Sequence, residues 1–282
     1  MKPDCHMHMI LDGMDYKKAI GRHRDGADVE FIRSTLAQYQ RLGYDYLRDG
    51  GDRWGAGKMA RQLAEEYGIR YRTPLSPLCK AGHYGGFIGE RYENLREYAA
   101  LVKKQGDNGA DFIKIMISGL MDFDRYGVLT EEGLTPEEIR ELIHIAQEEG
   151  FRVMAHANGA RTVQAAAEAG VASVEHGAYL DREALAAMAA HGTVWVPTLS
   201  AIGNLQGKGR FDEDAVKRIL DSSLANVAEF SAMGGLVACG SDAGAWAVTH
   251  GCDTEMHWLT AALADGTAAV VAAGNQAVME RF

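Results

Sequence analysis

The chain has 282 residues, 47% of them hydrophobic, which is enough for one large α/β barrel or for two ordinary domains, each with a sizeable core. It carries 29 Lys and Arg against 39 Asp and Glu, and the net charge of -10 argues against nucleic acid or an anionic membrane surface as the main partner. This composition is typical of a soluble, mildly acidic enzyme that acts on a small molecule.

The chain opens with the stretch MKPDCHMHMILDG, which sets His6 and His8 two residues apart. Residues i and i+2 of a β-strand point to the same face, so the two imidazoles would reach toward one point. The first five residues are just long enough to form a short strand that delivers this chelating pair, although H-x-H patterns also recur by chance.

Seven further β-rich segments follow and alternate with helical patterns along the chain. The eight predicted strands lie within residues 4–8, 44–51, 69–77, 111–118, 151–157, 171–177, 193–199 and 236–243. The clearest helix signal covers residues 135–150, where Thr135 can cap, Pro136 suits the first helical position and Glu138 completes a capping box. Further helices are predicted within residues 160–170, 181–192, 212–235 and 266–282.

Eight strand and helix units in about 250 residues predict a parallel (β/α)8 barrel, an α/β fold of the TIM-barrel type. A doubly wound open sheet is the structural alternative. No low-complexity linker marks a boundary, so we expect residues 1–282 to form a single domain.

Strong ligand residues recur where these strands end, and in barrels the carboxyl ends of the strands form the active site. Each residue has an ordinary structural explanation by itself, as a hydrogen-bonded histidine, an ion-paired lysine or a helix cap. One barrel mouth has no obvious structural need for all six together: His6, His8, Lys114, His156, His176 and Asp242.

This arrangement resembles the amidohydrolase superfamily, whose barrels carry H-x-H on strand one, Lys on strand four, His on strands five and six, and Asp on strand eight. The matching segments here read DCHMH, FIKIMISG, MAHANG, VEHG and GSDAG, in the same order over nearly the whole chain. The text AHANGARTVQAAAEAGVASVEHG resembles the imidazolonepropionase and prolidase-like branch. Many relatives add a β-sandwich built from both ends of the chain, which we expect to be missing here.

The resemblance implies that His6, His8 and Asp242 hold one divalent metal, that His156 and His176 hold a second, and that carboxylated Lys114 bridges them. A bare ammonium would be repelled by two cations, whereas a lysine that has reacted with carbon dioxide is an anionic carbamate. Imidazole and carboxylate ligands suit zinc, with manganese, iron or cobalt as alternatives. Asp242 would act as the general base in hydrolysis of an amide-like bond.

The loops after strands two, three and four offer candidates for substrate binding. The glycine-rich residues 79–92 can move as a lid, with His83 or Tyr84 against the substrate, and Tyr179 and His250 are further candidates for the pocket wall. Arg53 and Arg125 are candidates for binding a substrate carboxylate. The alternative for each of these residues is an ordinary loop position with no contact to a substrate.

The four cysteines, Cys5, Cys79, Cys239 and Cys252, are widely spaced and form no C-x-x-C pair, which favours reduced thiols and a cytoplasmic location. The opening residues also lack the apolar stretch of a signal peptide, and no apolar run is long enough to span a bilayer. The helix-rich exterior of a barrel offers surfaces for a homo-oligomer.

Three functions remain open from the sequence. The first is a metal-dependent hydrolase of a C–N bond in an amide, cyclic amide or dipeptide. The second keeps the metals but decarboxylates, deaminates or isomerises its substrate. The third is a non-catalytic barrel that binds a metal or ligand.

Overall fold

The computed structural model describes residues 2–282 as an alternation of parallel strands and helices. All eight predicted strand segments contain a strand, and two short strands, β4 and β5, are added between the third and fourth of them. The strands are β1 (Pro3–Met7), β2 (Tyr46–Asp49), β3 (Arg70–Arg72), β4 (Leu78–Lys80), β5 (Glu90–Tyr92), β6 (Ile113–Met116), β7 (Val153–Ala157), β8 (Ser173–His176), β9 (Val194–Val196) and β10 (Leu236–Val237).

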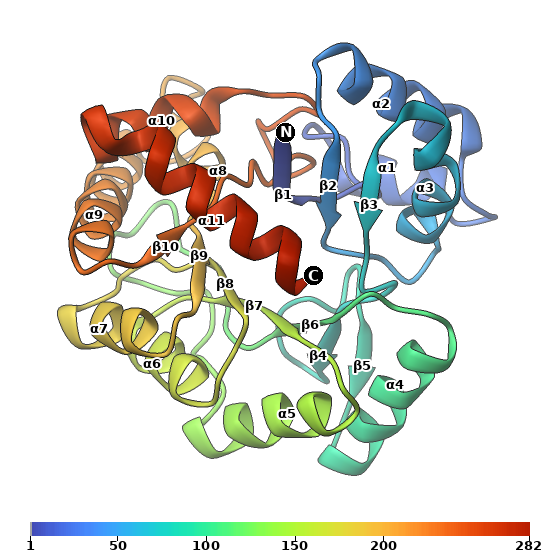
Figure 1. Cartoon of the computed structure of the whole chain (residues 1–282), viewed down its shortest axis with the longest axis horizontal. Coiled ribbons are helices and arrows are strands. Elements are labelled where there is room, and N and C mark those ends of the chain that lie inside the picture. The colour runs from blue at the N-terminus through green and yellow to red at the C-terminus, as the bar shows by residue number, and fades with distance from the viewer. Residues whose placement is uncertain (1) are drawn as a thin grey trace.

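The helices lie between and around these strands (Figure 1). They are α1 (Tyr16–Arg22), α2 (Val29–Arg41), α3 (Ala56–Ala64), α4 (Leu95–Asp107), α5 (Pro136–Glu148), α6 (Ala160–Glu168), α7 (Arg182–Ala190), α8 (Ser200–Gly203), α9 (Glu213–Ala232), α10 (Thr254–Leu263) and α11 (Thr267–Arg281), with short 3-10 turns η1 (Glu65–Tyr67) and η2 (Ala264–Gly266).

The predicted helix over residues 135–150 is confirmed together with its cap. The Thr135 side chain accepts a hydrogen bond from the backbone N–H of Glu138, and the Glu138 side chain accepts one from the backbone N–H of Thr135. Pro136 is the first residue of α5. This reciprocal capping satisfies two backbone donors that the first helical turn leaves without partners. No helix within residues 2–282 is long and apolar enough to cross a membrane.

The strands pair in parallel as two sheets, one of order β1-β2-β3 and one of order β10-β9-β8-β7-β6-β4-β5. The α/β barrel architecture is as predicted, but the hydrogen-bonded ladder is interrupted. Pro74 and Pro77 separate β3 from β4, and proline has no N–H for a ladder. β3 ends before Pro74 and pairs with β2, whereas β4 begins after Pro77 and pairs with β6.

The two sheets also meet between β1 and the segment that follows β10. Three backbone hydrogen bonds join them, from Cys5 N to Cys239 O at 2.9 Å, from Asp242 N to His6 O at 2.7 Å and from His8 N to Ala243 O at 2.7 Å. Residues from the two ends of the chain are thereby held beside each other.

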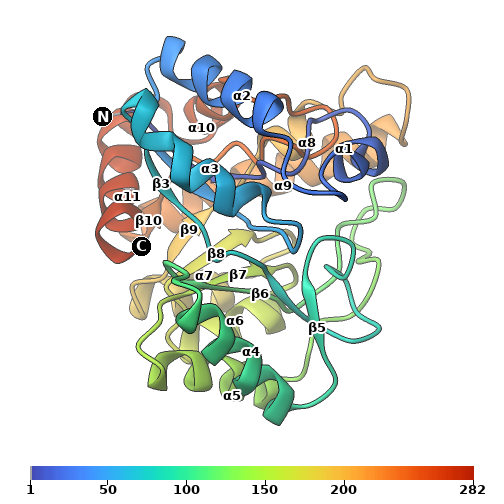
Figure 2. The same ribbon diagram turned by 90° about the vertical axis from the view of Figure 1, so that its right-hand side faces the viewer.

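Helix α11 closes the amino-terminal ends of the strands. Its Val278, together with Phe282, packs into a buried cluster with Tyr46 at the start of β2 and Phe112 just before β6. Figure 1 shows α11 crossing the strands, and Figure 2 shows it at the left while long loops extend at the right. The carboxyl ends of the strands are therefore free to build a site.

Candidate metal centre

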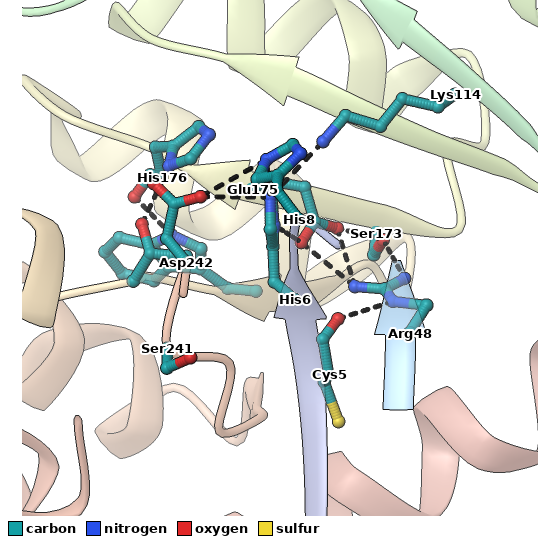
Figure 3. A network of polar contacts seen from close by, with 12 residues as sticks. Cys5, His6, His8, Arg48, Lys114, Ser173, Glu175, His176, Ser241 and Asp242 are labelled. Carbon is teal, nitrogen blue, oxygen red and sulfur yellow. Dashed lines mark hydrogen bonds and ion pairs between the residues drawn. The ribbon is translucent and has the colours of Figure 1, made fainter. Parts of the chain in front are cut away.

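His6, His8 and Asp242 bring three ligand atoms together at the carboxyl end of β1. The Nε2 atoms of His6 and His8 lie 3.2 Å apart, and Asp242 Oδ1 lies 3.5 Å from His6 Nε2 and 3.3 Å from His8 Nε2 (Figure 3). All three residues are buried, at 0%, 7% and 7% exposure. These three predicted metal ligands therefore share one point in space.

The spacing and chemistry of these atoms fit a divalent cation. Ligand atoms at about 2.0 to 2.2 Å from a tetrahedral zinc lie about 3.3 to 3.6 Å from one another. The Nδ1 atom of His6 lies 2.7 Å from Glu175 Oε2, so Nδ1 donates its proton to the carboxylate and Nε2 carries the lone pair. A cation between them would stabilise nitrogen lone pairs and a carboxylate oxygen that face one another at these distances.

Lys114 reaches this group from β6 on another part of the barrel wall. Its Nζ lies 3.4 Å from His6 Nε2, and the side chain is 1% exposed. Burial lowers the pKa of Lys114 to about 8, although the carboxylates of Glu175 and Asp242 oppose the shift. A lysine in such surroundings has a substantial fraction of neutral amine, the form that reacts with carbon dioxide.

His156 in β7 and His176 at the end of β8 complete the set, with ring centroids 4.5 Å apart, and His176 lies 5.1 Å from the ring of His6. Each ring has one nitrogen bonded to a protein oxygen: His156 Nε2 to Gly119 O at 3.2 Å, and His176 Nδ1 to Thr198 Oγ1 at 2.7 Å. Burial is the main reason that the pKa of His156 falls to about 3 and that of His176 falls well below its usual value. Both rings are therefore neutral, as metal ligands must be.

Backbone strain is concentrated at this end of the strands. His176, Thr198 and Asp242 have φ values of 69°, 49° and 58°, in the left-handed region that side chains with a Cβ rarely adopt. Such conformations each cost of the order of 1–3 kcal/mol and cluster at functional sites. The strained positions include two of the six predicted ligands and the hydroxyl partner of one of them.

Several buried groups that hold the ligands in place were not predicted from the sequence. Glu175 binds His6, Arg48 binds Glu175, and Asp4 accepts hydrogen bonds from Ser241 N and Ser241 Oγ at 2.9 and 2.6 Å. A signal was available, because Arg48 and Glu175 are charged residues inside segments predicted to be buried strands. Their pairing was not visible, since it joins β2 to β8 across the barrel.

Of the predicted substrate-binding residues, Tyr84 and His83 lie on the loop after β4. The Tyr84 ring lies 4.8 Å from the ring of His156, and Glu131 accepts a hydrogen bond from Tyr84 N at 2.7 Å. Glu131 Oε1 also lies 3.5 Å from Nδ1 of His83. Tyr179 follows β8, where its ring lies 5.5 Å from that of Tyr126 and its hydroxyl is buried with no hydrogen-bond partner among residues 2–282.

The His250 ring has protein partners on both sides. Its Nε2 is 2.9 Å from Leu11 O and its Nδ1 is 3.2 Å from the Tyr39 hydroxyl. Both ring nitrogens are engaged within the protein, so neither is free for a substrate. Arg125 is likewise paired, with Asp122 at 2.7 Å, whereas Arg53 is exposed and stacks on the Trp54 ring at 4.5 Å.

A sequence model described as the amidohydrolase family matches residues 43–279 of this chain, most of its length. The chain belongs to the amidohydrolase family.

Two proteins of known name are similar in sequence to parts of this chain. Ochratoxinase of Aspergillus niger is 26% identical over 236 residues, which cover 71% of this chain and 47% of the relative. Imidazolonepropionase of Maricaulis maris (strain MCS10) is 28% identical over 220 residues, which cover 68% of this chain and 54% of the relative.

The chain thus spans about half the length of the curated relatives it matches. Among solved structures, a Xaa-Pro dipeptidase with bound methionine in its active site superposes with a TM-score of 0.80 at 20% identity, over 99% of this chain and 75% of the dipeptidase. The ochratoxinase of A. niger superposes with a TM-score of 0.78 at 20% identity, over 98% of this chain and 68% of the other. These likenesses establish the amidohydrolase barrel fold.

Proposed function

We propose that this amidohydrolase is a metal-dependent hydrolase that cleaves a C–N bond in an amide, cyclic amide or dipeptide. The observation that carries the proposal is the convergence of His6 Nε2, His8 Nε2 and Asp242 Oδ1 to within 3.2–3.5 Å of one another. Family membership and the likeness to a Xaa-Pro dipeptidase support the same class of reaction.

The residues fit two divalent ions, with zinc the metal we propose. His6, His8 and Asp242 would hold one ion, His156 and His176 the other, and Lys114, as a carbamate, would lie between them. Metal ions held there would polarise the substrate carbonyl and would lower the pKa of the attacking water. The neutral state of the buried imidazoles and the low dielectric around Lys114 support this assignment.

Asp242 is the residue we propose as general base. Its Oδ1 faces the two histidines, which leaves the second carboxylate oxygen to accept a proton from the attacking water and return it to the departing nitrogen. The hydrogen bond from its own N–H to His6 O and the left-handed backbone hold the carboxylate in this position.

Tyr84 is the residue we propose to face the substrate. Its ring covers His156, and burial and the Asp242 charge raise the pKa of its hydroxyl, so the phenol stays protonated and can donate a hydrogen bond. His83 on the same loop and Tyr179 after β8 are further candidates for contact. His250 and Arg125 are weaker candidates because protein groups already occupy them.

The test is hydrolysis by purified protein loaded with Zn²⁺ in the presence of bicarbonate. A panel of dipeptides, N-acyl amino acids and cyclic amides is incubated in H₂¹⁸O, and mass spectrometry follows the products. We expect one class to yield a free amine and a carboxylate carrying ¹⁸O. Asp242→Asn and His8→Asn should abolish turnover, while His144→Asn, on the exposed face of α5, should retain it.

Products without ¹⁸O would contradict hydrolysis and favour decarboxylation or isomerisation at the same metals. Absence of turnover on the whole panel, in protein shown by elemental analysis to hold its metals, would contradict the proposed activity.

A further inference from the structure

A buried ion pair lies directly beneath the candidate metal centre. Arg48 of β2 and Glu175 of β8 are both 0% exposed, and Arg48 Nη2 lies 2.9 Å from each oxygen of the Glu175 carboxylate. Desolvation makes buried ion pairs costly, and well-packed apolar residues of similar volume are often equally stable in their place. Stability alone therefore does not explain why two charges lie inside this barrel.

The guanidinium of Arg48 is fixed on every side. Its Nε donates to Cys5 O at 2.6 Å, its Nη1 donates to Ser173 Oγ at 2.9 Å, and its face covers the ring of Phe282 at 4.5 Å. The partners come from β1, β8 and the residue after α11, so the group cannot rotate without breaking contacts to three parts of the chain. Arg48 is thus a rigid anchor for the carboxylate.

The Glu175 carboxylate uses its other interactions to reach a predicted metal ligand (Figure 3). Oε1 accepts a hydrogen bond from Ser173 Oγ at 2.5 Å, and Oε2 accepts one from His6 Nδ1 at 2.7 Å. The bond to His6 directs the lone pair of Nε2 toward His8 and Asp242. A carboxylate behind an imidazole fixes its tautomer and raises the basicity of the opposite nitrogen.

Among the four histidines predicted to bind metal, His6 alone has a carboxylate behind its ring within residues 2–282. His156 and His176 are oriented by neutral oxygens, from Gly119 and Thr198, and the Nδ1 of His8 is buried with no partner within the described residues. Only the His6 ring, within the part of the chain that the structure describes, pairs its non-ligand nitrogen with a buried carboxylate. His6 should accordingly be the strongest imidazole donor of the site.

We infer that Glu175, anchored by Arg48 and Ser173, is a positioning residue that sets the metal affinity of the centre through His6. This inference rests on the proposed function. Loss of such a partner typically weakens metal binding by about 10- to 100-fold. The effect should appear in metal affinity and in the His6 tautomer, before any turnover is measured.

The experiment compares the wild type with Glu175→Gln and with the double variant Arg48→Met/Glu175→Gln. The double variant removes both charges, so it avoids leaving an uncompensated guanidinium in the barrel if the single variant folds poorly. Asp221→Asn, in a surface pair with Lys217, is the control. Cobalt affinity is measured by chelator competition with visible absorption, and the His6 tautomer of the metal-free protein by ¹⁵N-resolved imidazole NMR.

We expect both Glu175 variants to unfold cooperatively, to bind Co²⁺ about 10- to 100-fold more weakly than the wild type and to lose the preference for a proton on Nδ1 of His6. Asp221→Asn should match the wild type. Wild-type affinity and tautomer in the double variant would overturn the role of Glu175 and leave the proposed metal centre standing. A wild type that takes up no Co²⁺ would overturn that centre, and this inference with it.

Discussion

The backbone of Gly50 lies against the imidazole of His8, so closely that a Cβ added to Gly50 would lie 2.2 Å from Cε1 and 2.6 Å from Nδ1 of the ring. Because Gly50 follows β2 directly, the end of one strand sets the orientation of a ligand that follows its neighbour β1. The absence of a side chain at Gly50 is thus part of the candidate metal centre.

Gly50→Ala should therefore displace the His8 ring. Any contact below 3.0 Å forces atoms to move, and we expect at least about a 10-fold loss of metal affinity. Titration with Co²⁺ measures the change. Gly21→Ala in α1, where an added Cβ meets nothing within 4 Å, is the matched control and should bind as the wild type does. Unchanged affinity in Gly50→Ala would show that the His8 position is not critical.

The hydrogen bonds between Asp4 and Ser241 should be important for stability. Ser241 Oγ donates to Asp4 Oδ2 at 2.6 Å and accepts from Ala243 N at 3.0 Å, so Ser241→Ala leaves buried polar groups without partners. We expect the free energy of unfolding to fall by about 1–3 kcal/mol. Urea denaturation measures it, and a loss below about 0.5 kcal/mol, the range of ordinary surface substitutions, would contradict this view of the segment.

His250 should make the protein sensitive to acid. Burial lowers its pKa in the folded state to about 4, from the usual histidine value of 6.5. Between these values the unfolded chain binds a proton that the folded protein does not, so stability is complete above about pH 6.5 and falls as the pH drops toward 4. From pH 7 to pH 5 this residue alone should account for about 2 kcal/mol.

The pH dependence is measured by urea denaturation of wild type, His250→Gln and His144→Gln at pH 7 and pH 5. His250→Gln should lose less stability on acidification than the wild type, and His144→Gln, which changes an exposed residue, should lose as much as the wild type. Equal losses in all three proteins would contradict the assignment of His250 as a buried neutral histidine.

Tyr84→Phe should separate substrate handling from metal binding. The ring remains to cover His156, while the hydroxyl donor is lost. We expect kcat/KM on the hydrolysed substrate to fall by about 10-fold or more, because a hydrogen bond to the reacting group is removed. Metal content, measured by elemental analysis, should stay at the wild-type value. A parallel loss of metal would mean that Tyr84 supports the ligands instead.

The regular elements and the six converging residues could be predicted from sequence because both depend on local patterns. Short β-rich segments that alternate with helices ending at glycine indicate parallel strands, and ligand residues at the strand ends must then meet at one mouth. The capping box at Thr135 and Glu138 is also local, and its prediction is confirmed.

What sequence did not reveal depends on contacts between distant parts of the chain. Arg48 and Glu175 are 127 positions apart, and they become a pair only because the folded chain brings β2 and β8 together. His250 is bonded to Tyr39 and Leu11, 211 and 239 positions away, so its ring partners could not be inferred from AVTHG. Pro74 and Pro77 were visible in the sequence, but the additional short strands β4 and β5 that follow them were not predicted.

Anomalous diffraction from crystals of the zinc-loaded protein would locate the ions and the modified lysine in one experiment. We expect two zinc peaks, one bounded by His6, His8 and Asp242 and one by His156 and His176, with extra density on Lys114 Nζ between them. Peaks elsewhere, or no peak in contact with Nε2 of His6, would contradict this arrangement.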